Sequence, residues 1–149
     1  MNLEEEINQK IFINEHQKLL INLLVTNNWL IAKNKSFFDD AAITQQQYNI
    51  LRILRGAKDA LSTLQIRERM MDKMSDTSRI VDRLILKGYT LKTVNTTDKR
   101  LVCVTITPKG LELLQSLDSK EMDMVHNLSN LTTKEAAKLN ELLDKIRNK

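Results

Sequence analysis

The sequence predicts a mainly α-helical fold with one small β-hairpin. Only one Pro and three Gly occur among 149 residues, and so few helix breakers favour long helices. Apolar residues recur at helical spacing along most of the chain, whereas residues 89–94 and 100–106 alternate in the two-residue period of strands. With 42% hydrophobic and 28% charged residues, the chain has the composition of one folded domain with a hydrophobic core.

The first expected helix covers residues 3–35. Its apolar stripe follows helical spacing and consists of Leu3, Ile7, Ile11, Leu20, Leu23, Leu24, Leu30 and Ile31. The core of one small chain cannot cover a helix of this length along its whole face. We therefore expect the helix to pack against a second chain; the alternative is a frayed N-terminal arm.

Capping residues mark where three later helices begin. In a capping box, a Ser or Thr and a Glu or Gln three residues later satisfy each other's free backbone N–H groups. This spacing occurs at Thr44 and Gln47, at Ser62 and Gln65, and at Thr132 and Glu135. The sequence thus predicts helices in TQQQYNILRIL, STLQIRERMM and LTTKEAAKLNELLDKI.

Two further helices flank the expected hairpin. The helix before it has Ser75 as its N-cap, Asp76 at the positive end of the helix dipole and Gly88 as its stop. The helix after it begins at Pro108, where the missing N–H costs nothing. Two short helices joined by a break at residues 72–73 form a helix-turn-helix candidate, and a hairpin directly after such a motif is called a wing.

Positive charge is concentrated in the middle of the chain. Residues 44–107 carry 12 Lys or Arg against 6 Asp or Glu, whereas residues 1–43 carry 4 against 6 and residues 108–149 carry 7 against 7. A basic centre favours a polyanionic partner, although a solvated surface has the same composition. The basic segment 44–107 contains the helix-turn-helix candidate and the hairpin, and we expect the chain, 1–149, to fold as one domain.

The second helix of the motif carries side chains suited to reading DNA. In a helix-turn-helix, the N-terminal residues of the second helix touch base edges in the major groove. Ser and Thr can bond to several base edges and to phosphates, and Arg can fork onto guanine O6 and N7. The candidates on this helix are Ser75, Thr77, Ser78, Arg79 and Arg83, and the two arginines share one side because they are four residues apart.

The hairpin tip is the second candidate contact with DNA. Lys99 and Arg100 would lie about the width of one DNA groove away from the second helix of the motif, where they can reach phosphates or the narrow minor groove. Asp98 can orient Arg100 through a charge-assisted hydrogen bond. The alternative is that TTDK is only a polar turn and that Asp98 and Arg100 form an ordinary surface pair.

The segments TQQQYNILRIL, SDTSRIVDRLILKG and TDKRLVCVTITPKGLELL together resemble the MarR family of winged-helix transcription regulators. The resemblance covers residues 44–114 by motif and the rest of the chain by helix order. It implies an obligate homodimer, held by the first and the last two helices, that binds a pseudo-palindromic operator. Residues 44–107 would then be the winged helix-turn-helix DNA-binding lobe, and residues 1–43 and 108–149 the helical dimerisation region. By position it places Thr77, Ser78, Arg79 and Arg83 on the recognition helix, and Asp98 and Arg100 on the wing.

Arg67 departs from the pattern of the family, which usually has a small Ala at this position of the first helix of the motif. The side chain either points outward, where it adds a phosphate contact, or it marks a looser pair of helices. Both interpretations stay open from the sequence alone.

Members of the family often bind phenolic or aromatic anions between the DNA-binding lobe and the dimer helices. The resemblance therefore implies a small aromatic ligand that acts as an effector. The aromatic residues available to line its pocket are Trp29, Phe37, Phe38 and Tyr48. The alternative is that these four side chains are ordinary core aromatics.

The sequence carries no pattern typical of other classes of function. It has no Gly-rich phosphate loop and no Ser/His/Asp arrangement, so we do not expect an enzyme. His16 and His126 stand far apart without a pattern of metal ligands, so we expect neither a metal nor another cofactor. Cys103 is the only cysteine, which excludes an internal disulfide and fits a reducing compartment.

The expected location and function follow from these observations. No run of about 20 apolar residues occurs, and the acidic, polar start of the chain is unlike a signal peptide. The sequence therefore predicts a cytoplasmic homodimer that binds double-stranded DNA as a sequence-specific transcription regulator and acts as a repressor. The alternative is a winged-helix scaffold for protein interactions that does not bind specific DNA.

Overall fold

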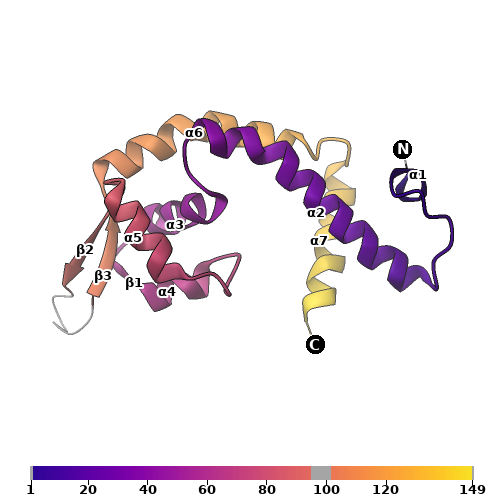
Figure 1. The fold of residues 1–149 in the computed structure, drawn as a ribbon, viewed down its shortest axis with the longest axis horizontal. Coiled ribbons are helices and arrows are strands. Elements are labelled where there is room, and N and C mark those ends of the chain that lie inside the picture. The colour runs from indigo at the N-terminus through magenta and orange to yellow at the C-terminus, as the bar shows by residue number, and fades with distance from the viewer. Residues whose placement is uncertain (1, 95–101, 149) are drawn as a thin grey trace. The chain divides into compact units, whose positions relative to one another are not determined.

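The computed structural model describes residues 2–94 and 102–148, and Figure 1 shows the order of its elements. The chain divides into two compact units. We call Met1–Ser36 with Met124–Lys149 the helical unit, and Phe37–Asp123 the lobe. The elements are α1 (Leu3–Glu6), α2 (Glu15–Asp40), α3 (Gln45–Gly56), β1 (Leu61–Ser62), α4 (Thr63–Arg69), α5 (Thr77–Leu86), β2 (Thr90–Val94), β3 (Val102–Ile106), α6 (Pro108–His126) and α7 (Thr133–Arg147).

The lobe combines helices α3, α4 and α5 and most of α6 with a small antiparallel sheet. Helices α3, α4 and α5 pack on one another, and α3 and α4 also pack on β3. The strand order is β1-β3-β2, and both pairings are antiparallel. The predicted hairpin is confirmed as β2 and β3, whereas β1 was not expected because its two residues are too few to show an alternating pattern. Asp98, Lys99 and Arg100 lie outside the described residues.

The core of the lobe draws one or two apolar side chains from almost every element. Its fully buried members are Ile50, Leu51, Ile66, Val81, Leu84, Val104 and Leu114. Burial of a side chain of this kind is worth about 1.5–3 kcal/mol relative to leaving it in water. The core therefore fixes the orientation of α5, whose opposite face stays exposed.

The three predicted capping boxes are confirmed. The side chains of Thr44, Ser62 and Thr132 each accept the backbone N–H of the residue three positions later. The side chain of that later residue in turn accepts the backbone N–H of the capping residue. The expectation that Ser75 caps α5 is wrong. The N-cap is Asp76, whose Oδ1 accepts the N–H of Arg79 at 3.2 Å, because a carboxylate is the stronger acceptor at the positive end of a helix.

The segment Thr107-Pro108-Lys109-Gly110 fastens the C-terminal end of α5. Gly88 ends the helix with φ of 76°, as the sequence predicts. The Thr107 hydroxyl donates to the carbonyl of Gly88 at 2.7 Å, and Lys109 Nζ donates to the carbonyl of Lys87 at 2.9 Å. A Cβ at Gly110 would lie 2.4 Å from the carbonyl oxygen of Tyr89, so only glycine fits this crossing. These contacts hold the C-terminal end of α5 in place against the segment that begins α6.

The N-terminal part of the helical unit differs from the expected single helix over residues 3–35. The chain leaves helical geometry between α1 and α2, where Asn8 adopts φ of 53°. Asn14 Oδ1 accepts the N–H of Gln17 at 2.9 Å, as an N-cap side chain does directly before a helix, so α2 begins anew after the break. At the other end, α2 continues through the segment SFFDD to Asp40. The apolar periodicity continues across the break between α1 and α2, so the sequence pattern does not indicate it.

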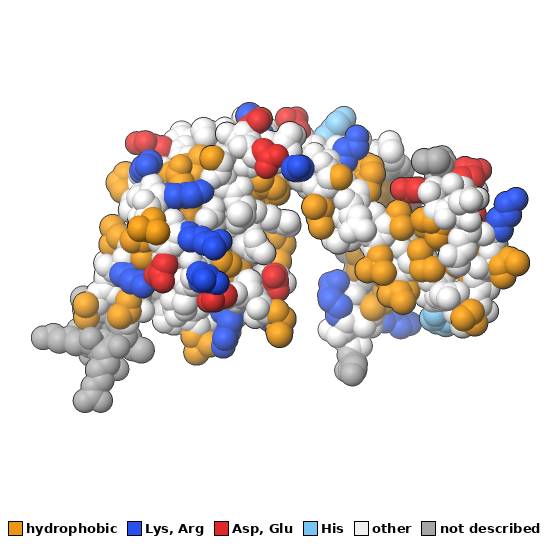
Figure 2. Space-filling view, viewed as in Figure 1, with side chains coloured by type: hydrophobic (Ala, Val, Ile, Leu, Met, Phe, Trp, Pro, Cys, Tyr) orange, Lys and Arg blue, Asp and Glu red, His pale blue; other side chains and the backbone are white. Residues whose placement is uncertain are grey.

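The helical unit buries little of its own apolar surface. Among its described residues only Leu3 is buried. Large apolar side chains remain exposed along its helices and include Leu20, Leu24, Ile31, Val125, Leu139, Leu142 and Ile146. Figure 2 shows hydrophobic side chains gathered over α2 and α7. No helix of the described chain is long and apolar enough to cross a membrane.

Candidate nucleic-acid interface

Helix α5 presents a basic, polar face on the side opposite its buried stripe. Ser78, Arg79 and Arg83 are exposed, whereas Val81 and Leu84 are fully buried. Figure 2 shows Lys and Arg side chains gathered over this helix. The two arginines follow each other by one helical turn, so they project along one line. Such a line of donors is suited to base edges and phosphates.

Two of the predicted contact residues fasten the turn before α5. Thr77 is only 4% exposed, and its hydroxyl donates to Met70 Sδ and to the carbonyl of Ser75, each at 3.5 Å. The half-buried Ser75 donates its hydroxyl to the carbonyl of Asp72 at 2.8 Å. The Thr77 hydroxyl therefore faces the core of the lobe rather than the solvent. Among the predicted residues of α5 itself, Ser78, Arg79 and Arg83 are left as the exposed candidates.

An ion pair joins the wing to the recognition helix. Lys92 Nζ on β2 lies 2.7 Å from Asp82 Oδ1 on α5, and both side chains are largely exposed. An exposed pair of this kind contributes about 0.2–1 kcal/mol, so it orients the strand more than it stabilises the lobe. The predicted contacts Asp98, Lys99 and Arg100 would extend from this hairpin, but they lie beyond the described residues.

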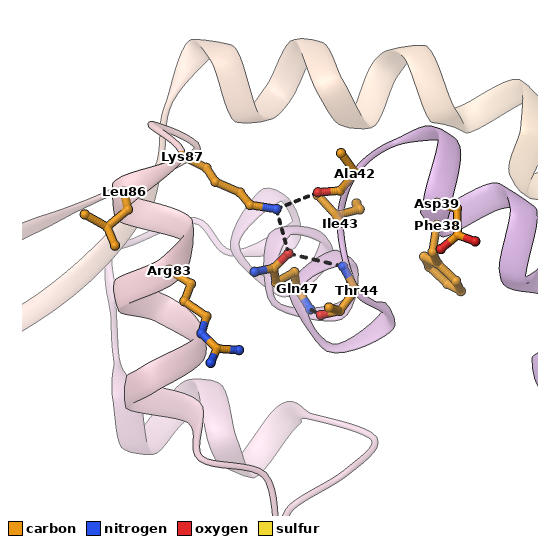
Figure 3. A pocket seen from close by; sticks show the side chains of 9 residues that line it. All are labelled: Phe38, Asp39, Ala42, Ile43, Thr44, Gln47, Arg83, Leu86 and Lys87. Atoms are coloured by element: carbon orange, nitrogen blue, oxygen red, sulfur yellow. Dashed lines mark hydrogen bonds between the residues drawn. The ribbon is translucent and has the colours of Figure 1, made fainter.

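A hollow of about 580 Å³ lies in the lobe beside the C-terminal half of α5 (Figure 3). Its lining residues are Phe38, Asp39, Ala42, Ile43, Thr44, Gln47, Arg83, Leu86 and Lys87. Arg83 and Lys87 reach it from α5, and Phe38 and Asp39 lie across from them. Lys87 Nζ donates to the carbonyl of Ala42 at 2.5 Å and to Gln47 Oε1 at 3.3 Å. The hollow thus combines two cations, Arg83 and Lys87, with one acidic side chain, Asp39, and with apolar side chains such as Phe38 and Ile43.

Three of the predicted pocket aromatics lie together in the lobe. Phe37, Phe38 and Tyr48 form an edge-to-face cluster with ring centroids 5.0–5.8 Å apart, but only Phe38 lines the hollow beside α5. Burial, assisted by the charge of Glu121, raises the pKa of Tyr48 to about 12. Trp29 belongs to the helical unit, where it lines a different hollow beside α1.

Lys87 is a pocket residue that the sequence interpretation missed. It stands four residues after Arg83, so the helical spacing that pairs Arg79 with Arg83 extends to it. The signal was hidden because Lys87 lies at the helix end, where a cation is expected to interact with the helix dipole.

The helix-turn-helix of α4 and α5, followed directly by the two-stranded hairpin β2–β3, defines the winged helix-turn-helix class of proteins. No protein-family model matches the chain. The Multiple antibiotic resistance protein MarR of Salmonella typhimurium is 30% identical over 106 residues, which cover 70% of this chain and 73% of that protein. The corresponding protein of Escherichia coli is 28% identical over the same shares. The chain therefore belongs to the MarR family of transcription regulators.

Solved structures share the fold over most of the chain. A mutant MarR from E. coli complexed with operator DNA matches with a TM-score of 0.79 at 26% identity, over 92% of this chain and 99% of that one. A MarR transcription factor from Planctomyces limnophilus matches with a TM-score of 0.67 at 29% identity, over 90% of this chain and 98% of that one. BpsR of Bordetella bronchiseptica, whose DNA binding is regulated by 6-hydroxynicotinic acid, gives 0.80 at 20%, over 94% and 99%, and this likeness concerns the fold alone.

Proposed function

We propose that the protein is a homodimeric repressor that binds a pseudo-palindromic operator in double-stranded DNA and is released by a small aromatic anion. The observation that carries the proposal is the exposed face of α5, where Ser78, Arg79 and Arg83 lie opposite a buried stripe. The related MarR of E. coli has been crystallised with operator DNA, which supports the same class of partner for this chain.

Base reading is assigned to the N-terminal half of α5. Arg79 stands in the first turn, where a recognition helix meets base edges, and its planar guanidinium can pair with guanine O6 and N7. Ser78 beside it can donate to a base or to a phosphate. Asp98, Lys99 and Arg100 complete the interface from the wing, with Asp98 orienting Arg100 toward a phosphate or the minor groove.

The dimer is assigned to the helical unit. A unit whose described residues bury only Leu3 cannot hold exposed stripes of Leu and Ile in water by itself. A second copy covers the same stripes by two-fold symmetry, which turns one DNA-binding lobe into two. The half-sites of the operator should then lie about one helical turn, roughly 10 base pairs, apart.

Release is assigned to the hollow beside α5. A carboxylate or phenolate would meet Arg83 and Lys87, while its ring would extend toward Phe38 on the opposite wall, beside the carboxylate of Asp39. Arg83 also belongs to the exposed line of DNA contacts, so a ligand that holds Arg83 withdraws it from DNA. Repression follows when the bound operator overlaps a promoter. The ligand ends repression because it competes with DNA for Arg83.

Selection of bound duplexes from a random DNA pool tests the proposal. We expect enrichment of an inverted repeat, with affinity that falls steeply as salt concentration rises. Placed between a promoter and a reporter gene, the enriched repeat should lower expression when the protein is present. Absence of any enriched sequence, with binding to random duplex no stronger than that of a neutral protein, would instead favour the scaffold for protein interactions.

A further inference from the structure

A second, smaller hollow lies between the two helices of the helix-turn-helix motif. It measures about 190 Å³ and is lined by Thr63, Leu64, Arg67, Ser75, Asp76, Thr77 and Ser78. Water occupies about 30 Å³ per molecule in the liquid, so the space can hold a phosphate group with several waters. Its walls come from α4 and from the start of α5, so it opens beside the exposed residues Ser78 and Arg79.

Arg67 is the cation of this hollow. Its neighbour Ile66 is fully buried in the core of the lobe, and successive residues of an α-helix point about 100° apart. Arg67 is accordingly exposed. No carboxylate within residues 2–94 and 102–148 forms an ion pair with it. Of the two interpretations open from the sequence, the exposure favours the side chain that points outward.

The charge of Arg67 decides which ligands the hollow can accept. The other ionisable side chain in the lining is Asp76, whose carboxylate is held in place by the N–H of Arg79 at 3.2 Å. Without Arg67 the hollow would carry one fixed negative charge and would repel an anion. With Arg67 the negative charge is offset, and the exposed Ser78 hydroxyl adds a donor.

We propose that Arg67 is a further DNA-binding residue, which holds a backbone phosphate at the mouth of this hollow. The inference rests on the proposed DNA-binding function, since that function supplies the phosphate. In a helix-turn-helix the first helix crosses the DNA backbone while the second enters the major groove, so a phosphate passes between them. The planar guanidinium suits two phosphate oxygens at once. The contact fixes the register of α5 on the duplex and carries no sequence information of its own.

The test compares Arg67→Ala with Arg69→Ala. Arg69→Ala is a matched control because it removes the same charge as Arg67→Ala. Arg69 is also exposed on the same helix but does not line the hollow. Each protein is titrated by fluorescence anisotropy against the selected operator and a random duplex at several salt concentrations. Unchanged circular dichroism melting shows that each variant folds as the parent does.

We expect Arg67→Ala to weaken binding to both duplexes by the same factor. The loss should be on the order of tenfold per half-site at about 0.1 M salt, because one phosphate contact contributes about 0.9 to the slope of log K against log salt. The slope of a dimer should therefore flatten by about 1.8. Arg67→Lys should keep the slope while losing part of the affinity, and Arg69→Ala should keep both.

Three results would overturn the inference. Equal behaviour of Arg67→Ala and Arg69→Ala would show that Arg67 acts only through net charge. A loss confined to the operator would make Arg67 a base-reading residue instead. If the parent protein binds neither duplex, the proposed DNA-binding function itself fails, which the first two results leave intact.

Discussion

The lobe and the helical unit have similar apolar patterns but bury them to very different extents. Every buried hydrophobic residue of the described chain except Leu3 belongs to the lobe. In the helical unit, side chains such as Leu24 and Leu142 keep about half of their surface in water, at 57% and 45% exposure. Apolar periodicity therefore indicates which face of a helix is apolar. It does not indicate whether that face packs against the same chain or against another one.

The difference also separates two roles. The lobe is closed by its own core, so it can present α5 in one fixed orientation. The helical unit leaves its apolar stripes exposed. In the proposed dimer, its stability would depend on the partner and hence on protein concentration. In the proposed function, the lobe binds DNA, and the helical unit sets the distance between the two DNA-binding lobes of the dimer.

The largest expected effect comes from the core of the lobe. Leu51→Ala should lower the free energy of unfolding by about 2–5 kcal/mol, because Leu51 is fully buried and its removal leaves a cavity. Urea denaturation monitored by circular dichroism measures the change. Leu86→Ala is the control, since Leu86 is 87% exposed and should change stability by less than about 0.5 kcal/mol. Equal effects of the two substitutions would deny that the lobe has the core described above.

The next effect tests whether a second copy covers the helical unit. Leu142→Asp should raise the dissociation constant of the dimer roughly hundredfold, because it places an unpaired carboxylate in a dry interface. Sedimentation at several protein concentrations measures the constant. Leu91→Asp provides the control, since Leu91 is similarly exposed, at 41%, but lies on β2 in the lobe. A dimer that tolerates Leu142→Asp would place the interface elsewhere.

A smaller effect separates DNA reading from dimerisation. Arg79→Ala should lose about 1–3 kcal/mol of operator affinity per half-site and relax the preference at one base pair, while the dimer stays intact. Leu142→Asp should lose DNA affinity together with the dimer. Titrations against the operator and a random duplex, combined with sedimentation, distinguish the two. If Arg79→Ala weakens both duplexes equally, Arg79 touches only phosphate.

Much of the fold could be predicted from local signals in the sequence. The three capping boxes, the stop at Gly88 and the start at Pro108 depend on residues within one turn of a helix end, so they could be read directly. Strand β1 could not, because it exists only through its pairing with β3. The break between α1 and α2 was missed because Asn8 and Asn14 gave weak signals inside a continuing apolar pattern.

The candidate site was predictable in type but less so in detail. The exposed arginines Arg79 and Arg83 follow from helical spacing alone. The burial of Thr77 does not, because it depends on Met70, seven residues earlier, lying within reach of its hydroxyl. Lys87 joins the hollow only because the segment after α2 brings the carbonyl of Ala42 to it. The sequence pattern carries no information about such contacts between separate segments.

The smallest effect compares two capping boxes of the same geometry, one in each unit. The box of α7 uses Glu135, and its hydrogen bonds with the backbone and side chain of Thr132 lower the pKa of that carboxyl below 4.5. A lowered pKa in the folded state means that the stabilisation is present above about pH 4.5 and disappears as the pH falls through the lowered value. The box of α3 uses Gln47, which does not titrate.

Acidification from pH 6 to pH 3 should therefore fray the start of α7 while the start of α3 keeps its protection. Hydrogen exchange at the backbone amides of the two first turns measures the difference. Glu135→Gln should make the first turn of α7 as insensitive to pH as that of α3, because the amide keeps the bond to the cap without a charge. If the two turns lose protection together in the parent protein, acid acts on the whole molecule, and the capping carboxylate of α7 is not the group that responds.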